Sequence, residues 1–302
     1  MPMTRSKQQA AARQPALQGL RHALRLLPRS LRPASHYALP HYIIIGAQKA
    51  GTTALDLAIA QHPNARTSLV QEVHFFDKHY PKGPNWYRRH FHTESENQST
   101  LSRTGHPLRS GESTPYYMFH PDCPRRVRKL VPEARLIALL RDPVTRAWSH
   151  YHHETTKGYD TVTPQQAFDQ SFEAQRLQNE EDRILHDPTY FSFAHNHFGY
   201  LARGRYAAQL EHWLEFFPRE QLLVLCSERF YADSPGTLAT VFRFLDLPDW
   251  TPPPAKKLNA RAYSGIDPAI RKHLTDYYAP HNEQLFRLIG ERFHEWTSPT
   301  GD

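Results

Sequence analysis

A short apolar run, followed at once by a glycine-containing turn and a helix, restricts this chain more than any other feature. Residues 41–46 read His-Tyr-Ile-Ile-Ile-Gly, and this β-branched run predicts a buried parallel strand. Residues 46–53 read Gly-Ala-Gln-Lys-Ala-Gly-Thr-Thr and predict a turn. Leu55, Ala58 and Ile59 then predict one face of a helix. This order of elements is typical of a site for a phosphate-like oxyanion, because backbone N–H groups and the helix N-terminus favour negative charge.

The turn differs from the Walker A loop of nucleoside-triphosphate hydrolases. That loop has Lys directly after its second glycine, where this chain has Thr52, and the lysine here, Lys49, lies inside the loop. No acidic residue follows an apolar strand in a clear magnesium-binding position. A transferred group with less charge than a terminal phosphate would not need the metal, and sulfuryl is such a group. A glycine turn with a surface lysine is the simpler interpretation and stays open here.

Two more apolar runs extend the fold. Residues 135–141 and 221–226 predict strands, and a helix from about 206 to 217 lies between them. Continuous apolar strands that alternate with amphipathic helices predict an α/β fold, a P-loop-like parallel sheet flanked by helices on both faces. Residues 154–200 are polar without a clear strand, and we expect them to form helices and loops over the active-site edge.

A second anion anchor follows the strand at 135–140. Arg141 stands at the carboxyl end of that strand, where open α/β sheets bind ligands. Pro143 suits the first turn of the next helix, and Asp142 is a plausible N-cap. Ser149 lies about two helical turns along, and an arginine with a hydroxyl would grip a second phosphate. A capped helix with a surface arginine is the alternative.

The net positive charge of the chain lies in its N-terminal segment. Net charge is +7, and residues 1–39 hold seven Lys and Arg but no Asp or Glu, so the remainder is formally neutral. We therefore predict a basic arm at residues 1–39, partly disordered or with a short helix, and a single domain at 40–302. The neutral body argues against nucleic acid as a partner. A solvated tail is the simpler interpretation of the arm, and an anchor for anionic membrane or polysaccharide is the alternative.

Cysteines, histidines and apolar runs bear on the metal sites, disulfides and cellular location that we expect. Cys123 and Cys226 match no metal or redox spacing, so we expect two free buried thiols, with one disulfide as the alternative. The 20 histidines lack a metal-ligand pattern. No run approaches the ~20 apolar residues of a membrane span, and no signal-peptide core stands at the N-terminus. We expect a cytoplasmic protein, with peripheral membrane contact through the arm as the alternative.

Together the two anchors resemble the motifs of sulfotransferases that use 3′-phosphoadenosine 5′-phosphosulfate (PAPS). The loop at 48–53 resembles the family's 5′-phosphosulfate loop, and Arg141 through Ser149 resembles its 3′-phosphate motif. Residues 71–77 (Gln-Glu-Val-His-Phe-Phe-Asp) and 111–116 (Gly-Glu-Ser-Thr-Pro-Tyr) are similar to segments of the heparan sulfate branch. The segment Gly-Arg-Tyr at 204–206 resembles a family segment near the nucleotide.

The resemblance implies a sulfotransferase fold, PAPS as donor, 3′-phosphoadenosine 5′-phosphate (PAP) as product, no metal, and a carbohydrate-type acceptor. It implies Glu72 as general base and Lys49 as the cation on the bridging oxygen. On the acceptor side it implies His74 and Asp77, and we group Glu112 with them as a rival for the base. The implied nucleotide-binding residues are Gln48, Lys49, Ala50, Gly51, Thr52, Thr53, Arg141, Ser149, Tyr206 and, from a late Pro-rich loop, Arg261.

Three points stay open at this stage. The branch usually has Lys after the Glu of its Glu-x-Thr-Pro segment, and this chain has Ser113 there, which leaves the acceptor geometry open. Apolar neighbours of Glu72 predict a raised pKa, whereas without the resemblance Glu72 is a surface carboxylate. A nucleotide-dependent phosphotransferase and a non-catalytic glycan- or anion-binding protein are the alternative functions. Hydroxyl or amine as acceptor group, and the oligomeric state, stay undecided.

Overall fold

A five-stranded parallel sheet forms the centre of the computed structural model, which describes residues 29–251 and 265–296. The strand order is β2-β3-β1-β4-β5. Three of the strands confirm the apolar runs predicted from the sequence, because most of their side chains are buried between layers of helices. The strands are β1 (Tyr42–Gly46), β2 (Ala65–Thr67), β3 (Arg109–Ser113), β4 (Arg135–Leu140) and β5 (Leu222–Cys226).

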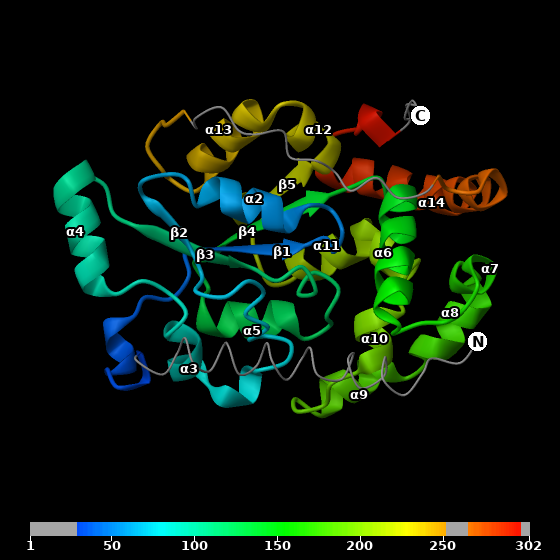
Figure 1. Ribbon diagram of the computed structural model, residues 1–302, viewed down its shortest axis with the longest axis horizontal. Helices are drawn as coiled ribbons and strands as arrows, with labels where there is room; N and C mark the ends of the chain where they lie inside the picture. The colour runs from blue at the N-terminus through cyan, green and yellow to red at the C-terminus, as the bar shows by residue number, and fades with distance from the viewer. Residues whose placement is uncertain (1–28, 252–264, 297–302) are drawn as a thin grey trace.

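Helices cover both faces of the sheet, with α2, α12 and α13 on one side and α5 on the other (Figure 1). This confirms the α/β fold class, a P-loop-like parallel sheet flanked on both faces. The helices are α2 (Thr52–Ile59), α3 (Pro84–Arg88), α4 (Glu94–Thr104), α5 (Cys123–Leu130), α6 (Pro143–Lys157), α7 (Pro164–Ala167), α8 (Gln170–Leu177), α9 (Glu180–His186), α10 (Phe193–His197), α11 (Tyr206–Leu214), α12 (Ser227–Ala232), α13 (Ser234–Phe244) and α14 (Pro268–Ile289).

The connections of β1 and β4 diverge. β1 and β4 are neighbours in the middle of the sheet. After β1 the chain continues to β2, the edge strand on one side, and after β4 it continues to β5, the edge strand on the other side. In open parallel sheets such a point leaves a crevice at the carboxyl ends of the two strands. The loops that follow β1 and β4 therefore meet at the position where this fold binds ligands.

Helix α6 begins as the sequence predicts. The Asp142 carboxylate accepts hydrogen bonds from the backbone N–H groups of Val144 at 3.3 Å and Thr145 at 3.1 Å, and Pro143 fills the first position. Gly158 ends the helix with a φ of 74°. Beyond α6, residues 158–200 form the short helices α7 to α10 and no strand, in agreement with the polar composition.

Residues 29–39 contact the body of the protein. Tyr37 is 2 % exposed and forms an antiparallel bridge with Thr93. The Arg29 guanidinium lies 4.8 Å from the Tyr37 ring centroid and donates to the Arg89 carbonyl at 2.9 Å. Packing thus begins earlier in the chain than the predicted boundary after residue 39. Residues 1–28, which carry most of the predicted arm, lie outside the described residues.

Both cysteines are buried and free, as predicted. Burial raises the pKa of the Cys226 thiol to about 12, so this group is protonated at neutral pH. Within the described part of the chain, every helix is too short or too polar to cross a bilayer.

Candidate active site

The turn after β1 depends on glycine at its last position. Gly51 has a φ of 99°, and a Cβ atom there would lie 2.5 Å from the Tyr231 hydroxyl. Lys49 also has a positive φ, 71°, which places this side chain inside a tight turn. The Ala50 carbonyl accepts a hydrogen bond from the Ser227 hydroxyl at 2.6 Å, so β5 and α12 hold the turn in place. Ser227 and Tyr231 were not predicted from the sequence.

Helix α2 starts at Thr52 with its N-terminus at this turn. The first N–H groups of a helix have no intrahelical acceptor, and they carry partial positive charge. The Thr53 hydroxyl accepts from the Gln71 amide at 2.5 Å. The Gln48 amide oxygen accepts from the Arg203 guanidinium at 2.5 Å. These two contacts fix both ends of the predicted phosphosulfate loop to residues from distant parts of the chain.

Arg203 supports the loop through hydrogen bonds from its buried guanidinium. Its side chain is 3 % exposed and donates further hydrogen bonds to the carbonyls of His195 at 2.9 Å and Asn196 at 2.8 Å. Burial lowers the pKa of Arg203 to about 10, and the guanidinium stays charged at neutral pH. A fixed cation here orients the Gln48 amide and adds positive potential to the loop.

Arg141 lies next to the loop, as expected for loops that follow the neighbouring parallel strands β1 and β4. Its guanidinium donates to the Lys49 carbonyl at 3.3 Å. The Tyr206 hydroxyl donates to the Arg141 carbonyl at 2.8 Å, and Tyr206 is 1 % exposed. Tyr206 therefore supports the end of β4 from within the core. Ser149 lies on α6 and is 1 % exposed.

Glu72, His74 and Asp77 form one hydrogen-bonded set. The His74 Nε2 atom lies 3.2 Å from the Glu72 carboxylate, and its Nδ1 atom lies 2.6 Å from the Asp77 carboxylate. Exposure falls along the set, from 42 % for the Glu72 side chain to 29 % for His74 and 2 % for Asp77. Glu72 and His74 have positive φ values of 54° and 53°, a strained backbone that often marks functional segments.

Interactions between the charges of these three residues determine their protonation states. Burial alone would lower the pKa of His74, but the adjacent carboxylates of Asp77 and Glu72 raise it to about 10. Burial would raise the pKa of Glu72 and of Asp77, but the hydrogen bond and charge of His74 lower both below their usual values. At neutral pH the set holds an imidazolium between two carboxylates.

The raised pKa predicted for Glu72 is therefore wrong. Its apolar neighbours Val73, Phe75 and Phe76 are at most 1 % exposed and point into the core. The Glu72 carboxylate points the other way and meets His74. A protonated imidazole at hydrogen-bond distance favours the charged carboxylate.

Glu112 lies deeper than its predicted place beside the acceptor. It is fully buried in β3, and its carboxylate accepts hydrogen bonds from the hydroxyls of Tyr87 at 2.5 Å, Thr114 at 2.6 Å and Tyr117 at 3.2 Å. Burial raises its pKa to about 7. The Thr114 hydroxyl also accepts from the backbone N–H of His74 at 3.4 Å. Glu112 thus supports the His74 segment indirectly, through Thr114.

Helix α6 adds two residues, His153 and Lys157, for which no sequence motif predicted a place beside the loop. The Lys49 ammonium lies 3.4 Å from the Nδ1 atom of His153. Lys157, one turn further along, is close enough for its charge to lower the pKa values of His153 and Glu72. The signal for both was their spacing, four and eight residues after Ser149 on one helix.

Some predicted residues fall outside this site. Arg261 and its neighbours in the late loop, Lys256, Lys257 and Asn259, lie outside the described residues. Across residues 29–251 and 265–296, no three His, Cys, Asp or Glu side chains are grouped so that they could hold a metal ion.

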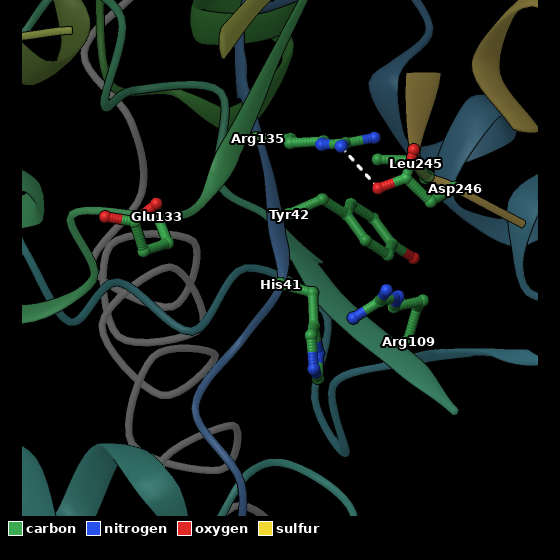
Figure 2. A pocket seen from close by; sticks show the side chains of 7 residues that line it. All are labelled: His41, Tyr42, Arg109, Glu133, Arg135, Leu245 and Asp246. Atoms are coloured by element: carbon green, nitrogen blue, oxygen red, sulfur yellow. Dashed lines mark hydrogen bonds and ion pairs between the residues drawn. The ribbon is translucent and has the colours of Figure 1, made fainter. Parts of the chain in front are cut away.

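A separate cavity of about 190 Å³ lies at the opposite edge of the sheet, where β1, β3 and β4 begin (Figure 2). In it Arg135 pairs with Asp246, while Glu133 lies apart from the other lining side chains. None of the predicted site residues lines this cavity, and it lies away from the carboxyl edge where they are grouped. The lining residues are His41, Tyr42, Arg109, Glu133, Arg135, Leu245 and Asp246.

Comparison with known proteins finds similarity to sulfotransferases. The family model of the sulfotransferase domain matches residues 39–275. The membrane-associated sulfotransferase kil1 of Dictyostelium discoideum is 28 % identical over 84 % of this chain and 66 % of its own length. Human heparan sulfate glucosamine 3-O-sulfotransferase 3B1 is 30 % identical over 84 % of this chain and 64 % of its own. The chain therefore spans slightly less than two thirds of the length of these relatives.

A solved structure agrees with the fold. The sulfotransferase from Alicyclobacillus acidocaldarius superposes with a TM-score of 0.61 at 28 % identity. The match covers 86 % of this chain and all of that one.

Proposed function

The chain belongs to the sulfotransferase domain family, and from this membership we propose that it transfers the sulfuryl group of PAPS to a hydroxyl or amine of a carbohydrate-type acceptor. The observation that carries the proposal is the meeting of two kinds of group at the carboxyl edge of the sheet. Lys49 and Arg141 supply cations beside a helix N-terminus, and the Glu72 set supplies a base. The Gln71–Thr53 hydrogen bond joins the two groups, and the charges of both Lys49 and Glu72 act on His153. The human relative is named for heparan sulfate glucosamine, which supports a sugar as acceptor.

The residues at this edge fit the donor. The turn at 48–53 fits a phosphosulfate because α2 begins at Thr52, beside the turn, and the first N–H groups of a helix favour an anion. Arg141 and Ser149 would hold the 3′-phosphate, since a guanidinium and a hydroxyl both donate to phosphate oxygens. When bound, PAPS supplies an activated sulfuryl group, and PAP is the product.

Two side chains would then do the chemical work. Glu72 is half-exposed and ionised at neutral pH, so its free carboxylate oxygen can take the proton of an acceptor hydroxyl. His74 and Asp77 fix the direction of that carboxylate. The Lys49 ammonium stabilises the negative charge that builds on the leaving oxygen.

Transfer of radiolabel tests this proposal. The purified chain is incubated with radiolabelled PAPS and with heparan-type saccharides, other glycans, lipids and peptides, each with and without EDTA. We expect label on a saccharide, with activity unchanged by EDTA. Binding of PAP without transfer to any acceptor would favour a non-catalytic binding protein. Turnover of ATP that EDTA abolishes would favour a phosphotransferase.

A further inference from the structure

Helix α6 carries three polar residues at four-residue intervals. Ser149, His153 and Lys157 share one face of the helix because four residues make about one turn. Ser149 is buried, His153 is partly exposed and Lys157 is exposed, so this face runs from the interior toward solvent. The middle residue, His153, contacts the Lys49 ammonium of the phosphosulfate loop.

Lys49 is held at both of its ends. Its backbone carbonyl accepts from the Arg141 guanidinium at 3.3 Å, and its ammonium lies 3.4 Å from the Nδ1 atom of His153. The lysine stem between these points has four rotatable bonds, so fixing it costs rotamer entropy. A partner at the ammonium therefore decides how often the charge points at the transferred group.

His153 has the protonation state that this contact needs. Burial lowers its pKa to about 4, and the nearby charges of Lys49 and Lys157 lower it further than the carboxylates of Glu154 and Glu72 raise it. The imidazole is neutral at pH 7, so its Nδ1 lone pair can accept a hydrogen bond from the Lys49 ammonium.

β3 has no basic residue directly after Glu112. The residue that follows Glu112 is Ser113, which is 3 % exposed. We propose that His153 is a positioning residue that aims the Lys49 ammonium at the transferred group. The inference rests on the proposed sulfotransferase function and concerns a residue that no motif of the sequence assigned.

A double-mutant cycle tests whether His153 acts through Lys49. The assay is label transfer from PAPS by the full chain carrying His153→Leu, Lys49→Ala or both changes. We expect His153→Leu to lower kcat roughly tenfold, less than the 10²–10³ lost with a direct donor, and to leave the KM for PAPS within about twofold. In the Lys49→Ala background the same change should cost nothing more.

Two further variants separate positioning from packing. His153→Asn places an amide oxygen near the Nδ1 position and should retain most of the kcat. His152→Leu changes the neighbouring residue, whose ring lies 4.5 Å from that of Trp148, and should leave kcat unchanged. Thermal melts of all variants check that each one folds.

Several results would overturn the inference. Losses that add in the double variant, an Asn variant no better than Leu, or a raised KM for PAPS at constant kcat would each show that His153 does not orient Lys49. A wild-type chain that transfers no label would refute the proposed function and this inference together. An active wild type with additive losses would refute the inference alone.

Discussion

The charge pattern of the Glu72, His74 and Asp77 set makes folding stability depend on pH in a specific window. The pKa of His74 is raised from 6.5 to about 10, so the folded state holds a proton that the unfolded chain releases. This contribution is fully present below pH 6.5 and is lost as pH rises through about 10. The two carboxylates act in the opposite sense, because their lowered pKa values stabilise the fold above pH 4.5 and are lost as pH falls further.

The size of the effect follows from the same values. The difference between 6.5 and about 10 corresponds to about 5 kcal/mol at 1.36 kcal/mol per pKa unit. Solvent reaches the Glu72 side of His74, and screening there reduces the figure to about 2–3 kcal/mol. Asp77→Asn removes the buried partner of His74, so at pH 6 we expect it to destabilise the fold by about this amount.

Urea unfolding between pH 6 and pH 10 measures the prediction. The wild type should lose about 2–3 kcal/mol across this range, and the Asp77→Asn curve should be flatter and meet it near pH 10. Asp246→Asn is the matched control, because Asp246 pairs with Arg135 at an exposed site and its removal should cost at most about 1 kcal/mol. A constant offset between wild type and Asp77→Asn at every pH would refute the reasoning.

Three further changes test the anion site and the N-terminal packing. Gly51→Ala should weaken PAP binding about tenfold in calorimetry, because a Cβ there meets the Tyr231 hydroxyl, whereas Gly290→Ala, at a φ of 71° in open space, should leave binding unchanged. Arg141→Ala should weaken PAP binding more than AMP binding, since only PAP has a 3′-phosphate, and an equal loss for both would contradict that role. Tyr37→Ala should lower unfolding free energy by about 3 kcal/mol in urea, and an unchanged midpoint would show that residues 29–39 do not stabilise the body.

Local patterns predicted the parts of the fold that local chemistry determines. The apolar runs of β1 and β4 and the Asp142 cap of α6 follow from a few adjacent residues. β2 has three residues, Ala-Arg-Thr, and gives no periodic signal. β3 reads Arg-Ser-Gly-Glu-Ser, and its polar centre is buried only because distant hydroxyls, such as that of Tyr87, satisfy Glu112.

The candidate site also combines a local motif with contacts from distant parts of the chain. The turn at 48–53 is a local motif, whereas its partners come from far along the chain: His153 lies 104 residues after Lys49, and Arg203 lies 155 residues after Gln48. No local pattern predicts such pairs. The pKa of Glu72 was misjudged because the backbone turns its carboxylate toward His74 and away from the apolar residues beside it in sequence.

Label transfer from PAPS by two glutamate variants tests the central claim most directly. Glu72→Gln should keep PAP affinity and lose transfer by about 10²–10⁴-fold, because the amide cannot take the acceptor proton. Glu112→Gln is the matched control, and its folded fraction should retain transfer, because that carboxylate lies in the core. Loss of transfer in Glu112→Gln together with full activity in Glu72→Gln would contradict the account and place the base on β3.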